Sequence, residues 1–244
     1  MISDAVGGGL SIREHLAASS CQTPGRPLLV AKNAYLGRAI IFRPNCKKWQ
    51  CPHCGQQRGR WCMVMAAYGH QELIEAGHGV SFATVTSNRH VRNLDAGIKR
   101  WRKNWPRLLR RIKREGGHTA YMQIPEQGKD GAYHVHILTT ASISERWLKD
   151  NAVQCGFGYI ADFEPVKHSG KAASYVSKYL TKHSHSLTWP KYFRRVNTSQ
   201  NWPRPEPLPK NPHWDITIAG KNDTVKRIMS RLRGEKWHID TFTT

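Results

Sequence analysis

Ala132-Tyr-His-Val-His-Ile-Leu138 has the alternation and the β-branched and aromatic content that predict a β-strand. Successive strand residues point to opposite faces, so His134 and His136 share a face and can hold one metal ion. Farther along, the run Lys171–Leu180 predicts a helix. Tyr175 and Tyr179 are four residues apart in it, so their side chains can reach one point.

The segments around this strand predict an α+β fold. Strands and helices alternate in the order β-α-β-β-α-β, which is the ferredoxin-like (RRM-like) plan of an antiparallel sheet with helices on one face. One more helix, the tyrosine helix, is appended. Pro106 is expected to kink or split the first of these helices. The expected elements are strand 80–86, helix 94–114, strand 119–125, strand 132–140, helix 144–155, strand 157–166 and helix 169–182.

Composition divides the chain into three expected segments. Residues 1–78 form an extension that holds two apolar β-like runs within 28–43, a cysteine-rich zinc module and a helix near 56–76. Residues 79–185 form the ferredoxin-like core. Residues 186–244 are rich in proline and tryptophan, and predict an extended strap followed by a loose tail.

The net charge is extreme, because 38 Lys and Arg stand against 17 Asp and Glu, for a formal charge of +21. Such an excess favours a nucleic-acid partner. A membrane partner is not expected, since no apolar run approaches the roughly 18 residues that span a bilayer. The N-terminus lacks the regions of a signal peptide, so we expect a cytoplasmic protein. The residues expected to contact DNA lie on two helices: Arg100, Lys103, Arg107, Arg110, Arg111, Lys171 and Lys182.

Glu126 is the expected third ligand beside the two histidines, because Mg²⁺ or Mn²⁺ prefers an acidic oxygen. A three-residue hairpin loop over 129–131, with Gly131 in the left-handed conformation, pairs Gly128 with Ala132 and places Glu126 opposite His134. A two-residue loop would turn Glu126 to the other face. Two ordinary half-buried histidines are the structural alternative.

The tyrosine helix also has a structural reading, since tyrosines four apart usually form a packing stripe. Lys178 lies one turn beyond Tyr175, however, and an ammonium beside that phenol would favour phenolate or steady charge on a phosphate. The neighbouring residues are small and polar. A metal ion beside two tyrosines suits the cutting and rejoining of a DNA strand.

Cys51-Pro-His-Cys54-Gly predicts a knuckle whose turn directs both thiolates at one Zn²⁺. Cys46 is a good third ligand. For the fourth, Cys21 is preferred, since Cys62 would lie about 12 Å along the following helix. His53 and His70 are weaker options, and free buried cysteines remain an alternative.

The motifs together resemble the HUH endonuclease superfamily. His134-Val-His136 resembles its HUH motif, Thr84-Val-Thr86 its first motif, and Tyr175-Val-Ser-Lys178-Tyr179 its third. The pattern is most similar to two-tyrosine rolling-circle replication initiators of single-stranded DNA phages, over about residues 80–182.

The resemblance implies that Mn²⁺ or Mg²⁺ on His134, His136 and Glu126 polarises a phosphate, which Tyr175 or Tyr179 attacks to give a 5′-phosphotyrosine and a 3′-OH. It implies single-stranded DNA at an origin hairpin or nick site as substrate, in the host cell of a phage or plasmid. No Walker-type loop is present, so helicase and polymerase are expected from the host. A two-tyrosine transposase and a non-catalytic zinc-containing nucleic-acid-binding regulator remain alternatives.

Overall fold

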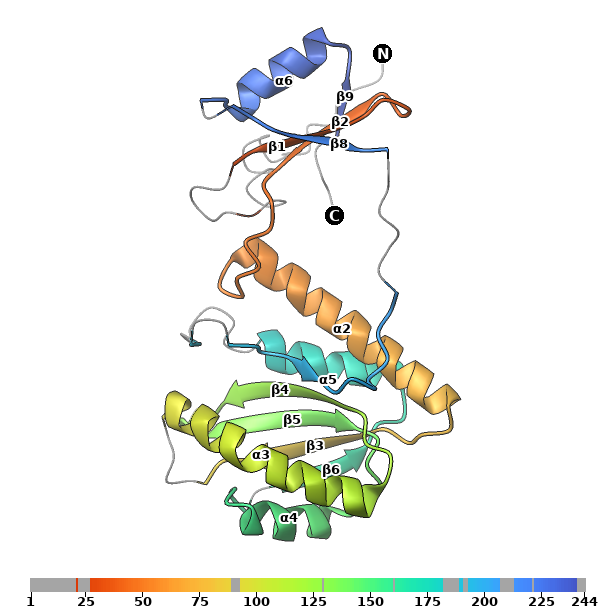
Figure 1. Cartoon of the computed structure of the whole chain (residues 1–244), viewed down its shortest axis with the longest axis vertical. Coiled ribbons are helices and arrows are strands. Elements are labelled where there is room, and N and C mark those ends of the chain that lie inside the picture. Colours follow the sequence, from red (N-terminus) through yellow and green to blue (C-terminus); the bar gives the residue numbers. More distant parts are fainter. Residues whose placement is uncertain are drawn as a thin grey trace, which may run out of the picture. The chain divides into compact units, whose positions relative to one another are not determined.

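The computed structural model describes residues 21, 27–88, 93–128, 130–159, 161–181, 189–190, 193–206, 213–220 and 222–240. Contacts group the chain into two compact units, drawn in Figure 1. Gly59–Glu206 form the core unit, and Met1–Arg58 with Pro207–Thr244 form the smaller unit. The three segments expected from composition stay a prediction. Within the described ranges, no helix is both long and apolar enough to cross a bilayer.

The core unit is built on a five-stranded sheet with the order β6-β3-β5-β4-β7. Every neighbouring pair is antiparallel. The first four strands in this order have the ferredoxin-like arrangement, which confirms the predicted fold class. The strands are β3 (Ser81–Thr86), β4 (Tyr121–Gln127), β5 (Tyr133–Thr139), β6 (Ala161–Pro165) and β7 (Asn197–Thr198).

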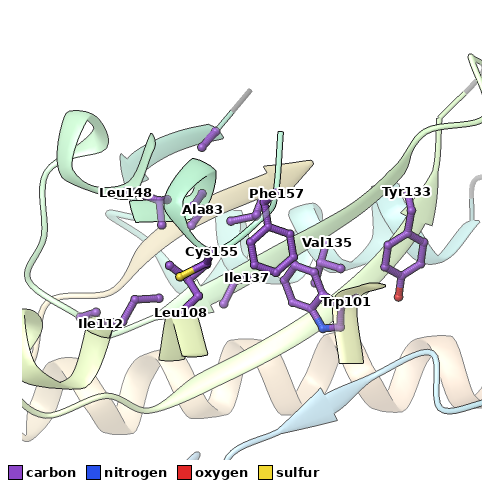
Figure 2. Close-up of a cluster of buried hydrophobic side chains, with 14 of the residues drawn as sticks. Ala83, Trp101, Leu108, Ile112, Tyr133, Val135, Ile137, Leu148, Cys155 and Phe157 are labelled. Atoms are coloured by element: carbon purple, nitrogen blue, oxygen red, sulfur yellow. The ribbon is translucent and has the colours of Figure 1, made fainter. Parts of the chain in front are cut away.

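Two helices, α3 (Leu94–Gly116) and α4 (Glu145–Gln154), cover one face of this sheet and bury the main core there (Figure 2). Trp101, Leu108 and Ile112 of α3 pack against alternate strand residues such as Val135 and Ile137. Because these strand positions face α3, the intervening positions face the other side of the sheet.

Side-chain caps begin both helices. Asn93 caps α3 by accepting hydrogen bonds from the backbone N–H groups of Asp95 and Ala96. Ser144, one of two expected caps, begins α4 by accepting from the Trp147 N–H. Helix α3 continues through Pro106 as one element. The expected split does not occur, because the apolar stripe is buried on both sides of the proline.

The helix α5 (Ser169–Thr181) lies on the opposite face of the sheet, over Phe82 and His136. Ala172, Val176 and Leu180 are its buried stripe. The second part of α2 (Pro52–Glu75) belongs to the same unit, and its His70 ring nitrogen lies 2.9 Å from the Val166 carbonyl oxygen. A two-sided sheet results.

The Pro- and Trp-rich segment after Trp189 reaches the edge of this sheet. Strand β7 pairs with β4, and Ser199 donates its N–H to the Tyr121 carbonyl. Trp202 is fully buried and donates its indole N–H to the Met65 carbonyl at 3.2 Å. A Cβ added at Gly69 would come within 2.4 Å of that indole nitrogen, so this helix position requires glycine.

The smaller unit holds a second sheet with the order β8-β1-β2-β9. The two apolar runs expected within 28–43 are its central hairpin. Helix α6 packs Ile228, Met229 and Leu232 against Val30 and Ile41. The sequence analysis did not predict α6, β8 or β9, because two of them are very short and all follow a proline-rich stretch. The elements are β1 (Leu29–Asn33), β2 (Arg38–Phe42), β8 (Asp215–Ile218), α6 (Val225–Gly234) and β9 (His238–Asp240).

Candidate functional site

Two histidines of β5 point to the α5 side of the sheet, and the neighbouring strand orients both rings. Thr84 pairs with His136 across the β3–β5 ladder, and Thr86 pairs with His134. The Thr84 hydroxyl lies 3.0 Å from Nδ1 of His136, and the Thr86 hydroxyl lies 2.9 Å from Nδ1 of His134. Hydrogen bonding at Nδ1 leaves Nε2 of each ring as the atom for another partner.

Glu126 occupies the position that the three-residue loop predicts. Gly131 has φ of 81°, the Gly128 N–H donates to the Ala132 carbonyl at 2.8 Å, and Glu126 pairs with His134. Its carboxylate nevertheless reaches diagonally, and Oε2 lies 2.8 Å from Nε2 of His136. The two side chains are only 12% and 5% exposed. The carboxylate therefore contacts the nearer of the two rings along the diagonal rather than the ring directly opposite.

The donor chemistry of this group fits a small divalent cation. Adjacent ligands of an octahedral Mg²⁺ at about 2.1 Å are about 3 Å apart, close to the observed separation of Glu126 and His136. His134 is more distant, with its ring centroid 6.4 Å from that of His136. Among the described residues, the cysteine cluster alone brings three or more such ligand atoms within 4.8 Å of one another. This structure therefore preforms the Glu126–His136 half of the expected site.

Both tyrosines of α5 reach the same aromatic cluster. The Tyr179 ring stacks on His136 with centroids 3.5 Å apart. The Tyr175 ring stacks on Phe82 at 4.2 Å, and Phe82 lies 5.6 Å from His136 and 5.7 Å from Tyr179. The sequence analysis did not assign a role to Phe82, although its place two residues before Thr84 puts it on the histidine face. The imidazole and phenol pairs thus share one face of the sheet.

The Tyr175 hydroxyl donates to Oε1 of Glu164 on β6, a partner that the sequence analysis missed. Burial is the main cause that raises the pKa of Tyr175, and the hydrogen bond to Glu164 raises it further. Lys171 opposes both effects. In this structure the phenol is therefore held in its protonated form.

The cations beside the two phenols differ from the expectation for Lys178. Its ammonium lies 5.3 Å from the centroid of the Tyr179 ring. The ammonium over Tyr175 is that of Lys171, at 5.5 Å. Helical side chains lean toward the N-terminus, so Tyr175 meets the residue one turn before it rather than one turn after it. Lys171 was expected only as a DNA contact.

The other expected DNA contacts lie apart from this site. Arg100, Lys103, Arg107 and Arg110 are exposed on α3, which covers the opposite face of the sheet. Arg111 is half-buried and donates to the side chains of Asn151, at 2.7 Å, and Gln154, so it joins α3 to α4. Lys182 lies outside the described residues.

The smaller unit gathers four cysteines. The ligand atoms of Cys21, Cys46, Cys51 and Cys54 all lie within 4.8 Å of one another. The sulfurs of Cys21 and Cys51 are 3.9 Å apart, and those of Cys46 and Cys54 are 3.6 Å apart. Tetrahedral Zn²⁺ with Zn–S bonds of about 2.3 Å separates its sulfurs by about 3.8 Å, so the cluster could hold a zinc ion.

Burial, with hydrogen bonds from neighbouring thiols, raises the pKa of Cys54 to about 12. A buried cluster of this kind stays protonated without a cation, because clustered thiolates would repel one another. Metal binding would therefore have to release protons. Cys62 is buried in α2 and does not belong to the cluster.

Comparison with known proteins places one family on the core unit. Residues 80–184 match the family model described as Replication-associated protein, of the ORF2 type. The matched segment runs from β3 to the end of α5 and includes both histidines and both tyrosines. The match supports a rolling-circle Rep-type initiator. No curated protein and no solved structure matches the chain.

Proposed function

We propose that this protein initiates rolling-circle replication by nicking single-stranded DNA and later rejoining it. One observation carries the proposal: the Tyr179 ring stacks directly on His136, so the phenols and imidazoles line one face of the sheet. The matched family supplies the context of replication. The net charge of +21 suits a polyanionic substrate.

In the proposed reaction a tyrosine oxygen attacks the scissile phosphorus in line. A bond from phosphorus to the tyrosine oxygen forms while the bond to the 3′ oxygen breaks, giving a 5′-phosphotyrosine and a free 3′-OH. One phosphodiester is exchanged for another, so a later attack by the 3′-OH can reseal the strand without ATP. The free 3′-OH is the primer for synthesis.

The side chains around the tyrosines prepare this attack. Glu164 accepts the Tyr175 proton in a hydrogen bond and is placed to take it as the phenol becomes a nucleophile. Lys171 and Lys178 place positive charge beside the two rings, where a phosphate would carry negative charge. Two nucleophiles on one helix allow one to hold a cut strand while the other cuts the regenerated origin.

His134, His136 and Glu126 would hold Mg²⁺ or Mn²⁺, which when bound supplies a Lewis acid for the scissile phosphate. Thr84 and Thr86 fix the orientation of the two imidazoles that present their Nε2 atoms. The structural Zn²⁺ would belong to the four cysteines. The proposed partners are an origin hairpin or nick site and the helicase and polymerase of a host.

Covalent adduct formation tests this function directly. Wild-type protein incubated with single-stranded DNA and Mn²⁺ is expected to yield a protein–DNA adduct. Tyr175→Phe with Tyr179→Phe should abolish the adduct, whereas each single change leaves some. Tyr159→Phe, at an exposed tyrosine remote from the cluster, is the matched control.

The same assay separates the competing functions. A non-catalytic regulator would bind DNA and give no adduct with any variant. A two-tyrosine transposase would form the adduct but would join the strand to a second DNA rather than reseal the same circle. An adduct that survives the double change would remove both tyrosines from the mechanism.

A further inference from the structure

A second concave site lies on the other face of the core sheet. It is a hollow of about 490 Å³ between α3, the β4–β5 strands and the segment that contains β7. The hollow falls within the range of small-ligand sites, about 300–1,000 Å³. Trp101 and Tyr133, two of its lining residues, stand side by side with Val135 in Figure 2.

Aromatic rings form the walls of this hollow. Trp105 stacks on Trp101 with centroids 5.0 Å apart, and Tyr121 meets Trp105 edge-on at 5.5 Å. Phe193 lines the hollow from the following segment. Trp105 is only half-buried, so part of its surface remains for another ring. Stacking of a base on such a surface contributes about 1–3 kcal/mol and tolerates any base.

The floor of the hollow carries a polar group that lacks a partner. Gln123 of β4 lines the hollow and is 4% exposed, and its Nε2 has no hydrogen-bond partner. An unpaired buried amide costs about 1–3 kcal/mol, which makes an isolated donor at this position unexpected in a core. A ligand with an acceptor atom would satisfy this amide donor.

Arginines supply the remaining element. Arg102 and Arg194 line the hollow and are exposed. Arg102 lies 6.0 Å from the Phe193 ring centroid, so its guanidinium is beside the aromatic wall. A guanidinium at this position suits a phosphate, which it can bind with two parallel hydrogen bonds.

We propose that this hollow binds one nucleotide unit, with the base against Trp105, an acceptor of the base on the Gln123 amide, and the phosphate near Arg102 and Arg194. The inference rests on the proposed function in taking the single-stranded DNA substrate as the source of that nucleotide. A free nucleotide has the same chemistry. The hollow lies on the α3 side of the sheet, so it is a strand-holding site separate from the tyrosines.

Binding is measured with the full chain carrying Tyr175→Phe and Tyr179→Phe, so that no adduct forms. The probes are labelled oligo(dA), oligo(dT) and oligo(dC), and the corresponding free deoxynucleotide monophosphates. Gln123→Met, which removes the amide at nearly constant size, should weaken binding of at least one probe about tenfold, the contribution of one bound base. Arg194→Gln, at an exposed residue that folding tolerates, should weaken it about threefold or more. Arg146→Gln on α4 is the charge-matched control.

Each outcome decides the matter. Weaker oligonucleotide binding by Gln123→Met and Arg194→Gln, but not by Arg146→Gln, supports the site with a strand as its ligand. Weaker binding of monophosphates alone supports the same chemistry with a free nucleotide as ligand. Equal binding by all three variants overturns the proposal. Adduct formation by protein with both tyrosines is scored separately, so the loss of one function does not imply the loss of the other.

Discussion

The rings of His136 and Tyr179 lie face to face, with centroids 3.5 Å apart and planes 19° apart. One belongs to a strand in the middle of the sheet and the other to a helix appended after the ferredoxin-like plan. Their contact joins the two motifs that the sequence keeps separate. It also places Tyr179 nearer to the histidines than Tyr175, whose ring stacks on Phe82.

The threonines of β3 are expected to set the affinity for the catalytic metal. Thr84→Val removes the hydroxyl that holds Nδ1 of His136, and loss of such a partner typically costs about 10–100-fold in metal affinity or activity. The Mn²⁺ concentration for half-maximal adduct formation should rise by that order. Thr84→Ser keeps the hydroxyl and should restore the wild-type value. Equal Mn²⁺ dependence of the Val and Ser variants would contradict this role.

Glu126 is expected to act through charge rather than through packing. Glu126→Gln keeps the size of the side chain and removes the negative charge beside His136. Adduct formation should fall at least about tenfold at limiting Mn²⁺, because the proposed metal loses its acidic ligand. Thermal unfolding under the same conditions is the control. A variant that nicks normally at low Mn²⁺ would exclude Glu126 as a ligand.

The pKa of Tyr175 should fall when Glu164 loses its charge. Burial and the Glu164 hydrogen bond both raise this pKa above the ordinary value of about 10. Glu164→Gln removes the second cause, so the phenol should ionise at lower pH, measured as the ultraviolet absorbance of tyrosinate. Subtracting the titration of Tyr175→Phe isolates the one residue.

The raised pKa also has a consequence for stability. A folded-state pKa above the unfolded value stabilises the fold fully below about pH 10 and loses that contribution as pH rises through the folded-state pKa. The wild type should therefore lose more stability than Glu164→Gln above about pH 10, in denaturant titrations. A larger alkaline loss in the variant would reverse the sign and contradict the assignment.

Zinc is expected at one ion per chain, measured by elemental analysis of the purified protein. Cys51→Ser removes one of four ligands and should lower both the zinc content and the melting temperature of the smaller unit. Cys62→Ala changes a buried cysteine outside the cluster and should keep the zinc. Full zinc content in Cys51→Ser would assign the metal to other residues.

The sequence predicted the local geometry of the site because strands and helices have fixed periods. The shared face of His134 and His136 follows from a period of two, and Gly131 fixed the hairpin register that aligned Glu126. The reach of Tyr175 and Tyr179 to one cluster follows from helical spacing.

The unpredicted parts depend on long-range pairing. Glu164 meets Tyr175 only because β6 pairs with β3 at Phe82, a register that no local motif encodes. The position of α3 across the sheet likewise separates its arginines from the tyrosines, although both are basic in sequence. Local pattern cannot tell which face of a sheet a helix covers.

The smaller unit draws its sheet from both ends of the chain, since β1 and β2 gain their outer neighbours β8 and β9 from residues 215–240. During synthesis the N-terminal hairpin emerges first, yet it must wait on the ribosome for the last strands and for α6 to cover its apolar side. The core unit, whose residues are contiguous, has no such delay. Nascent chains stalled before residue 213 should therefore present a finished ferredoxin-like body beside an exposed, unsealed hairpin that chaperones can recognise.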